Sequence, residues 1–150
     1  MLKLILLLVL TQPEVNGTVI EVGDGDTVKI LLENGKEQKV RLSGIDAPEK
    51  DQAAGAASRK ALEGLIGGKE VSVRFTGHSF DRRVGHIYLG EMNVQHEMLR
   101  QGWAWHSPKF SSSREQEEMQ CEARTESRGL WSDPHPIEPW IWRKRPKRQG

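Results

Sequence analysis

The sequence lacks three features that would narrow its class at once: a set of cysteines, a long apolar segment, and a strong excess of charge of one sign. The single Cys121 excludes disulfide bonds within the chain, and its polar surroundings favour a passive side chain over a nucleophile. The apolar run at residues 4–10 is far shorter than the roughly 20 residues that a membrane-spanning helix needs. The net charge of +1 says little about partners. What remains is a chain of 150 residues, enough for one domain around one core.

The two ends of the chain differ in composition from the rest. Residues 1–14 begin with one positive charge and the apolar run, as a secretory signal does, but no small-x-small cleavage site follows. We therefore expect a truncated export signal or a disordered start, with an additional strand as the alternative. Residues 144–150 are basic, and we expect them to be disordered, because charge runs of this kind are usually solvated rather than dedicated to a nucleic-acid contact.

Between these ends, β-branched runs alternate with helix-prone stretches. The expected strands are 17–22, 27–32, 38–45, a segment containing Val71, Val73 and Phe75, and 83–89. The expected helices are 53–66, a second one that Asn93 caps and Gly102 closes, and 114–128. Prolines after Asp133 argue against regular structure there, and Trp140 and Trp142 are expected to fasten that segment to the body of the domain. The pattern alone predicts an α+β fold.

Two turns carry most of the candidate chemistry: Asp24-Gly25-Asp26-Thr27, and Arg41-Leu-Ser-Gly-Ile-Asp46-Ala-Pro48-Glu49. If the second and third strands pair, Asp26 and Asp46 lie near the same end of a hairpin, where two carboxylates repel unless a cation lies between them. Alternation along the third strand points Arg41 away from the apolar row, where its guanidinium can grip a phosphate. These residues favour a metal-dependent phosphodiesterase. The alternative is that both motifs are ordinary turns.

The spacing of these motifs resembles the signature of the staphylococcal-nuclease-like (thermonuclease) family. Every signature position from Asp24 to Glu49 is filled, and the stretches 87–105 and 129–134 also resemble secreted bacterial members. The resemblance covers residues 15–143 and implies a five-stranded OB-fold β-barrel with three helices. Because such members are commonly exported, it also favours a secreted or periplasmic location.

The resemblance further implies a set of site residues. The metal ion would be Ca²⁺, bound by Asp26, Asp46 and the backbone carbonyl of Ala47, with water in the remaining positions. Many relatives have threonine where this chain has Ala47, and a main-chain ligand tolerates that difference. Arg41 and Glu49 would be catalytic, with Glu49 accepting a proton from the attacking water or orienting it. The alternative for Glu49 is an acidic residue at the start of a helix.

The second arginine that would donate hydrogen bonds to phosphate is harder to place, because the chain departs from the family's Asp-x-Tyr-Gly-Arg pattern. An alignment without a gap puts Arg82 in the catalytic position, a gapped one chooses Arg83, and we favour Arg82. A neighbouring carboxylate could pair with this arginine and weaken its hold on phosphate, and one aromatic stacking platform is lost, so reduced substrate affinity is expected. The departures are His78, Phe80, Asp81 and Ser107.

These residues together predict a Ca²⁺-dependent endonuclease that acts on DNA and RNA, preferably single-stranded, with little sequence preference. By resemblance it cuts the 5′ P–O bond and leaves 3′-phosphates. We expect a monomer without a membrane span. The alternative is a catalytically silent OB-fold module that binds single-stranded nucleic acid or a protein partner. Retention of the acidic and basic signature residues argues against it, because a binding module has no evident need for clustered carboxylates beside a polyanion.

Overall fold

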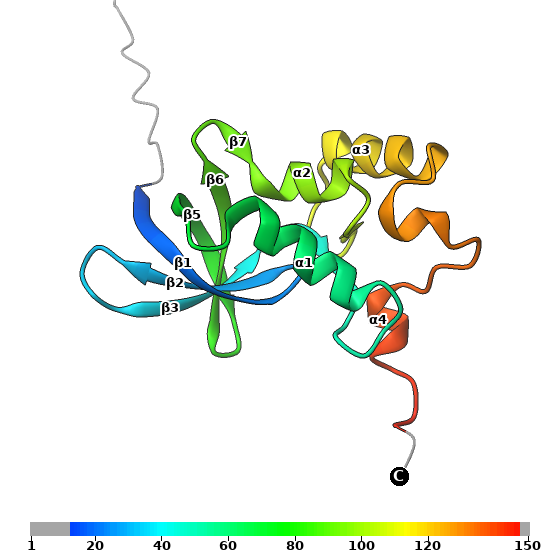
Figure 1. Cartoon of the computed structure of the whole chain (residues 1–150), viewed down its shortest axis with the longest axis horizontal. Helices are drawn as coiled ribbons and strands as arrows, with labels where there is room; N and C mark the ends of the chain where they lie inside the picture. The colour runs from blue at the N-terminus through cyan, green and yellow to red at the C-terminus, as the bar shows by residue number, and fades with distance from the viewer. Residues whose placement is uncertain (1–12, 148–150) are drawn as a thin grey trace, which may run out of the picture.

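The computed structural model describes residues 13–147 of the chain. Residues 1–12 of the predicted signal-like segment and 148–150 of the predicted basic tail lie outside the described residues. Figure 1 shows strands gathered at one end of the molecule and most of the helices toward the other. Within the described part of the chain, no helix combines the length and apolar character that crossing a membrane requires.

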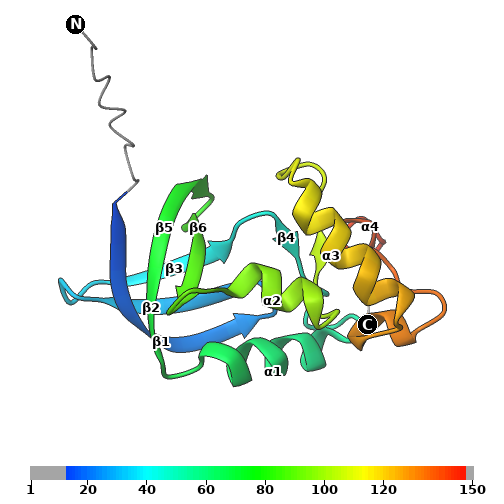
Figure 2. The same cartoon turned by 90° about the horizontal axis from the view of Figure 1, so that it is seen from above.

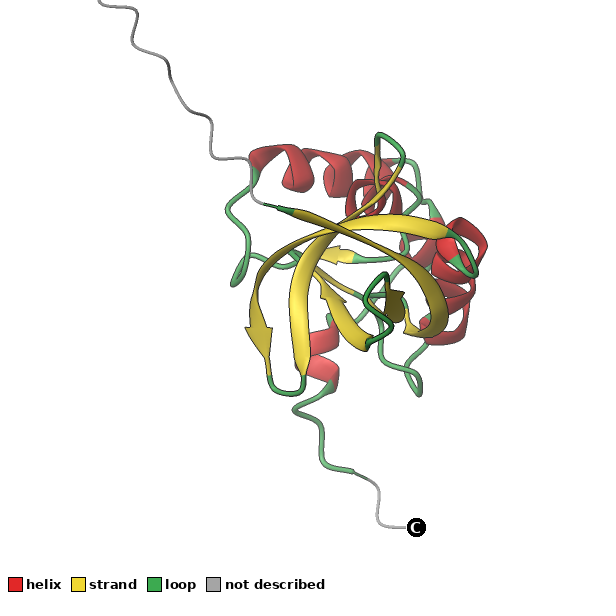
Figure 3. Ribbon diagram, turned by 90° about the vertical axis from the view of Figure 1, so that its left-hand side faces the viewer, coloured by secondary structure: helices red, strands yellow, loops and turns green. Residues whose placement is uncertain are grey.

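Five strands close into a mixed β-barrel, which confirms the predicted fold class (Figure 3). Neighbouring strands run antiparallel in the order β3-β2-β1-β5-β6, and a parallel pairing of β3 with β6, with Val40 opposite Arg83, closes the barrel. Closure removes the free sheet edges on which other chains could pair. The strands are β1 (Glu14–Asp24), β2 (Thr27–Leu32), β3 (Glu37–Leu42), β5 (Glu70–Ser79) and β6 (Arg82–Leu89).

The main core fills the barrel and the space under the helices that cover it. In β2, Val28 and Ile30 are buried while Lys29 between them reaches solvent, as the two-residue period of a strand requires. The helix α1 (Gly55–Ile66) adds Leu62 and Ile66, both fully buried. Burying one such side chain stabilises the fold by about 1.5–3 kcal/mol. The helices α1 and α2 (Val94–Arg100) lie side by side across the barrel (Figure 2).

The helix ends follow local capping chemistry. The Asn93 side chain accepts a hydrogen bond from the His96 N–H at 3.0 Å, which confirms the predicted cap of α2. Gly102 has φ +77°, a conformation that glycine adopts without strain, and it closes the same helix. The third helix, α3 (Arg114–Thr125), is capped by the Ser113 hydroxyl and ends before the predicted residue 128.

One predicted strand is divided in two. The segment expected at 38–45 leaves the barrel at Leu42, because Gly44 has φ +78° and turns the chain. The next two residues form β4 (Ile45–Asp46), which pairs with β8 (Trp105–His106) in a separate small sheet. The short β7 (Met92–Asn93) extends the barrel sheet beyond β6. The break at Gly44 gives Asp46 a position that is independent of the barrel strand carrying Arg41.

The expectation of no regular structure after Asp133 is wrong at one place. A single helical turn, α4 (Pro139–Trp142), forms there because proline at the first position of a helix has no N–H to leave unpaired. The Trp142 indole N–H donates to Asp51 Oδ1 at 3.1 Å, and the Trp140 ring packs edge-on against Trp105. The predicted anchoring by both tryptophans is confirmed, and a 3₁₀ turn, η1 (Gly129–Ser132), leads into the segment.

Acid should destabilise this barrel through His86. Burial lowers the pKa of His86, helped by the positive charge of Arg74, and the neutral ring nitrogen Nδ1 accepts from the Gln95 side-chain amide at 3.1 Å. A histidine pKa that is lower in the folded state gives stability that is complete above its unfolded value and is lost as pH falls through the folded value. The contribution of His86 should therefore lower the urea midpoint as pH falls from 7.5 to 5, against an opposite contribution from Asp26, whose pKa is raised in the folded state.

The matched variant is His86→Asn, whose amide oxygen can still accept from Gln95 but does not titrate. Its urea midpoint should fall less over the same pH range than that of the unmodified protein. Equal losses in both proteins would show that other groups control the acid sensitivity.

Candidate active site

The turn between β1 and β2 positions the first carboxylate. The backbone N–H of Asp26 donates to Asp24 Oδ1 at 3.0 Å, and the Thr27 hydroxyl donates to Asp26 Oδ1 at 3.0 Å. Gly25 lets this turn approach helix α1, since a Cβ atom there would lie 1.8 Å from the Ser58 hydroxyl and 2.8 Å from the Ala47 Cβ. In this Asp-Gly-Asp turn, the Asp24 carboxylate therefore fixes the backbone that carries Asp26, and the position between the two aspartates has no room for a side chain.

The carboxylates of Asp26 and Asp46 both lie beside one nitrogen atom of Arg41, although twenty residues separate them in the sequence. Arg41 Nη2 lies 3.4 Å from Asp26 Oδ2 and 3.5 Å from Asp46 Oδ1. The other terminal nitrogen of Arg41 donates to the backbone carbonyls of Leu42 and Ile45 at 2.9 and 2.8 Å, which holds the guanidinium in place. The structure therefore brings together both predicted metal-binding carboxylates and one predicted catalytic arginine.

The two carboxylates are buried, and that of Asp26 is incompletely neutralised. Asp26 is 5% exposed and Asp46 is 3% exposed. Burial raises the pKa of Asp26 to about 6, and this effect outweighs the opposing effect of the Arg41 charge. The Ala47 N–H donates to Asp26 Oδ2 at 2.7 Å and partly compensates. Buried carboxylate oxygens of this kind favour an additional positive charge beside them.

A cleft of about 700 Å³ opens over these carboxylates. Glu49, 33% exposed in its side chain, lies at its wall, where the Gln52 side chain accepts from the Glu49 N–H at 3.0 Å. Phe80 and Phe110 are 99% and 70% exposed, so each ring offers a flat apolar face to the cleft. The charged residues that line it are Asp24, Asp26, Arg41, Asp46, Glu49, Arg82, Lys109, Arg143 and Lys144.

The structure separates the two candidate phosphate donors. Arg82 lines the cleft and donates to the Thr27 hydroxyl at 3.3 Å, next to Asp26. Arg83 lies on the opposite face of β6, with its guanidinium 3.5 Å above the centre of the Phe75 ring. Of the two, only Arg82 is placed to reach a ligand beside the carboxylates.

One of the expected effects of the sequence departures turns out differently. Asp81 pairs with Lys39 at 3.3 Å rather than with its neighbour Arg82, and the hydrogen bond from Lys39 lowers the pKa of Asp81. The positive φ at the hairpin tip falls on Phe80, at +57°, and not on Asp81. Asp81 therefore leaves the Arg82 guanidinium available, and the backbone strain moves to an aromatic residue at the hairpin tip.

Known proteins resemble this chain over most of its length. The family model described as "Staphylococcal nuclease homologue" matches residues 39–133. The chain belongs to the staphylococcal nuclease family. It is 40% identical over 134 residues to a protein of Escherichia coli O157:H7 named "Uncharacterized endonuclease", covering 88% of this chain and 87% of that protein. A protein of the same name from Haemophilus influenzae is 38% identical over 130 residues, covering 86% and 73% of the two chains.

A plant relative matches a shorter part of this family member. "Probable staphylococcal-like nuclease CAN2" of Oryza sativa subsp. japonica is 40% identical over 110 residues, which is 73% of this chain and 30% of the plant protein. The region shared with the bacterial relatives is thus nearly the whole chain, whereas the plant protein is considerably longer.

Sequence reasoning about this family member missed Arg143. Its guanidinium donates to both oxygens of Asp46, at 3.1 and 2.7 Å, and to Glu49 Oε1 at 2.7 Å. These hydrogen bonds, chiefly those to Asp46, raise the pKa of Arg143. The sequence placed this residue at the start of a basic run, and no local pattern indicates that a side chain 97 positions away reaches Asp46. The prolines and tryptophans just before Arg143 were the only signal in the sequence that this segment is anchored to the body of the domain.

The donor atoms of this staphylococcal nuclease family site fit a hard divalent cation. Carboxylate oxygens from Asp26 and Asp46 converge in a buried place, and a guanidinium already bridges Asp46 and Glu49 as a cation would. Among residues 13–147 there is no group of three or more histidine, cysteine, aspartate or glutamate side chains gathered as a ready-made metal cluster. A cation would therefore need backbone carbonyl and water ligands as well, and the carbonyl of Ala47 remains the predicted one.

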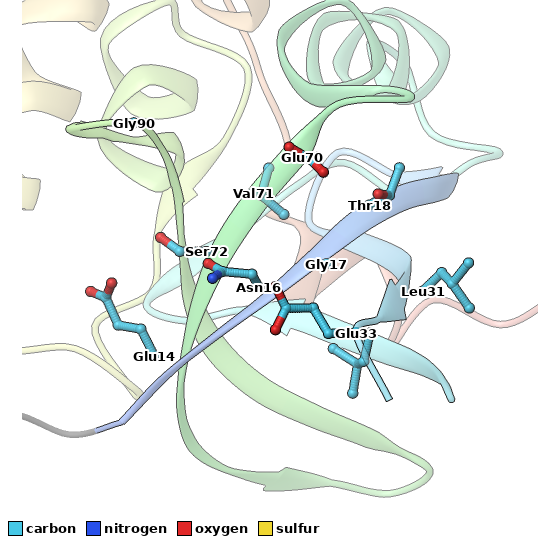
Figure 4. A pocket seen from close by; sticks show the side chains of 11 residues that line it. Glu14, Asn16, Gly17, Thr18, Leu31, Glu33, Glu70, Val71, Ser72 and Gly90 are labelled. Atoms are coloured by element: carbon cyan, nitrogen blue, oxygen red, sulfur yellow. The ribbon is translucent and has the colours of Figure 1, made fainter. Parts of the chain in front are cut away.

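A second hollow, of about 600 Å³, lies between β1, β2 and β5 (Figure 4). Glu14, Glu33 and Glu70 line it, and its described lining residues include no lysine or arginine. A phosphate backbone would be repelled there, whereas the cleft over Asp26 and Asp46 carries five basic side chains beside its four acidic ones.

Proposed function

We propose that this chain is a Ca²⁺-dependent endonuclease that hydrolyses phosphodiester bonds in DNA and RNA with little sequence preference. The observation that carries the proposal is that Asp26 and Asp46 share Arg41 Nη2 in a cleft that also holds Glu49 and Arg82. Family membership and relatives named as endonucleases support the nuclease activity. The proposed products carry 3′-phosphates, formed by cleavage of the 5′ P–O bond.

The chemistry needs charge stabilisation around phosphorus. Held by Asp26, Asp46 and the Ala47 carbonyl, a bound Ca²⁺ would supply positive charge to a phosphate oxygen. Arg41 and Arg82 donate hydrogen bonds to the phosphate oxygens as negative charge increases in the transition state. Glu49 accepts a proton from the attacking water or orients it, and the leaving oxygen takes a proton from solvent.

The walls of the cleft favour flexible, unpaired strands. Phe80 and Phe110 can stack on bases, and stacking contributes about 1–3 kcal/mol per base without demanding a particular sequence. Lys109 and Lys144 add positive charge along the cleft for the phosphate backbone. Single-stranded DNA and RNA are therefore the proposed preferred substrates.

A monomer is sufficient, because every group that the proposal uses comes from one chain. A secreted or periplasmic location remains part of the proposal.

Removing the cation should stop the reaction. Purified protein incubated with denatured DNA is expected to cleave it in Ca²⁺ and to lose at least about 10²-fold in rate when a chelator is added, because transition-state charge is then left unneutralised. Fragment ends are checked by extension with terminal transferase, which should require prior phosphatase treatment if the ends are 3′-phosphates. Cleavage that continues at full rate in the chelator would contradict the metal mechanism.

One observation favours a second candidate, a silent OB-fold module that binds single strands or a protein partner. Arg143 pairs with Asp46 and Glu49, which neutralises two of the groups that the nuclease mechanism needs. If this pairing is permanent, the cleft binds nucleic acid without cutting it. Binding of labelled single-stranded DNA with no cleavage in Ca²⁺, Mg²⁺ or Mn²⁺ would select this candidate.

A further inference from the structure

Arg143 reaches the acidic site from a segment outside the matched family region. The family model ends at residue 133, and Arg143 follows the α4 turn beyond it. Its guanidinium contacts Asp46 through both terminal nitrogens and Glu49 through one of them, with its side chain 45% exposed. The pairing with Asp46 is bidentate, which is the geometry in which a guanidinium binds a carboxylate most strongly.

Two hydrogen bonds fasten the segment that carries Arg143 to the loop that carries Glu49. The Gln52 side-chain amide donates to the Ile137 carbonyl while its oxygen accepts from the Glu49 N–H, so one buried side chain ties the segment to the Glu49 loop. The Trp142 indole N–H adds a bond to Asp51 in the same loop. The backbone just before Arg143 is therefore held beside the carboxylates, and the Arg143 side chain itself is partly exposed to solvent.

A divalent cation needs oxygens that Arg143 holds. Both Asp46 oxygens accept from Arg143, and Oδ1 also faces Arg41. A Ca²⁺ ion at a bonding distance of about 2.3–2.6 Å from either oxygen would lie beside the Arg143 guanidinium, where two positive charges repel. The ion and the side chain therefore cannot both hold Asp46 closely.

We propose that Arg143 is a built-in counter-cation that competes with the divalent ion for Asp46 and Glu49. It compensates the carboxylates when the ion is absent, and it must release Asp46 for the ion to bind. The consequence is a lowered affinity for the metal, set by the strength of the Arg143 pairing. This inference rests on the cation site of the proposed function.

The test measures Ca²⁺ binding without nucleic acid, by titration calorimetry on the full chain. Arg143→Ala should bind Ca²⁺ roughly tenfold more tightly than the unmodified protein, because a charge-assisted pair that is partly exposed to solvent no longer has to be broken. Its melting temperature should be lower in chelator, and saturating Ca²⁺ should raise it by more than in the unmodified protein. Arg143→Lys cannot form the bidentate pair, so its affinity for Ca²⁺ should lie between those of the other two proteins.

Arg145→Ala is the matched control, since it removes the same charge from the same segment. The Arg145 guanidinium lies 4.9 Å from the centre of the Trp142 ring, and its loss should leave the Ca²⁺ dissociation constant within about twofold. If Arg143→Ala is poorly folded by circular dichroism, the ranking of Arg143→Lys against Arg145→Ala decides the question.

The possible failures are distinguishable. Ca²⁺ binding that is equal or weaker in the Arg143 variants than in Arg145→Ala would overturn the competition while leaving the metal-dependent nuclease intact. Undetectable binding of Ca²⁺ in every protein, together with cleavage that resists chelator, would remove the proposed metal mechanism and this inference with it.

Discussion

Replacing Glu49 by glutamine should lower the rate of strand cleavage by about 10²–10⁴-fold while leaving the affinity for single-stranded DNA nearly unchanged. The amide keeps the size and the hydrogen-bonding reach of the carboxylate, but it cannot take a proton from water. Glu49 lies at the wall of the cleft, beside Asp46 and outside the core, so its loss leaves the packing intact. Single-turnover cleavage of an end-labelled oligonucleotide gives the rate, and fluorescence anisotropy without metal gives the affinity.

The matched control for this variant is Glu63→Gln on α1. Glu63 is half exposed and pairs with Arg59 at 3.0 Å, away from the cleft, so the same chemical change there should leave the cleavage rate unaltered. A parallel loss of rate and affinity in Glu49→Gln, or a drop in its melting temperature of the kind that a misfolded loop produces, would assign Glu49 a structural role in holding Arg143 and the loop. The hydrogen bond that Arg143 donates to Glu49 is the contact through which Glu49 would have such a structural role.

Changing Arg82 to lysine should reduce cleavage by about 10²-fold, far more than changing Arg83 to lysine. A lysine retains the charge but loses the planar fork that can bridge two phosphate oxygens. Arg83 lies on the other face of β6 with its guanidinium on the Phe75 ring, so its replacement removes this stacking contact and none in the cleft. Both variants are to be assayed at saturating Ca²⁺ on the same substrate, with the turnover number as the measured quantity.

The Arg82 and Arg83 variants control for each other, because the chemical change and the strand are the same. If Arg83→Lys proves to be the slower enzyme, phosphate is held from the opposite face of β6, and the gapped alignment describes the site better than the geometry of the cleft does. Equal effects would indicate that the arginines act through general charge rather than through directed hydrogen bonds.

The sequence anticipated most of the site because its residues lie in short motifs next to turns. Asp26 completes the Asp-Gly-Asp turn, and Arg41 lies one residue before the end of β3, so the pairing of β2 with β3 carries both to one end of a hairpin. Strand alternation likewise predicts that Arg82 and Arg83, as neighbours along one strand, lie on opposite faces of β6. These are local rules, and they remain valid whatever the rest of the chain does.

The errors arose where a contact joins distant segments or where one residue changes the backbone. The strand expected at 38–45 is broken by the positive φ of Gly44, and Asp81 prefers Lys39, a neighbour from another strand, to Arg82. Arg143 had no counterpart among the sequence motifs. The helical turn at α4 formed within a proline-rich segment, because proline in the first turn of a helix is compatible with helical geometry.

The periodicity of the amino-acid sequence determined an α+β fold, and its short motifs determined the family resemblance, which implied the closed five-stranded barrel and the site residues Asp26, Arg41, Asp46 and Glu49, because short motifs encode local geometry. Only the tertiary structure decided that Asp26 and Asp46 converge on a single nitrogen of Arg41, and that a guanidinium from the end of the described chain lies on Asp46 and Glu49. Contacts between segments so far apart depend on how the whole chain packs, since no local interaction selects one distant partner over another.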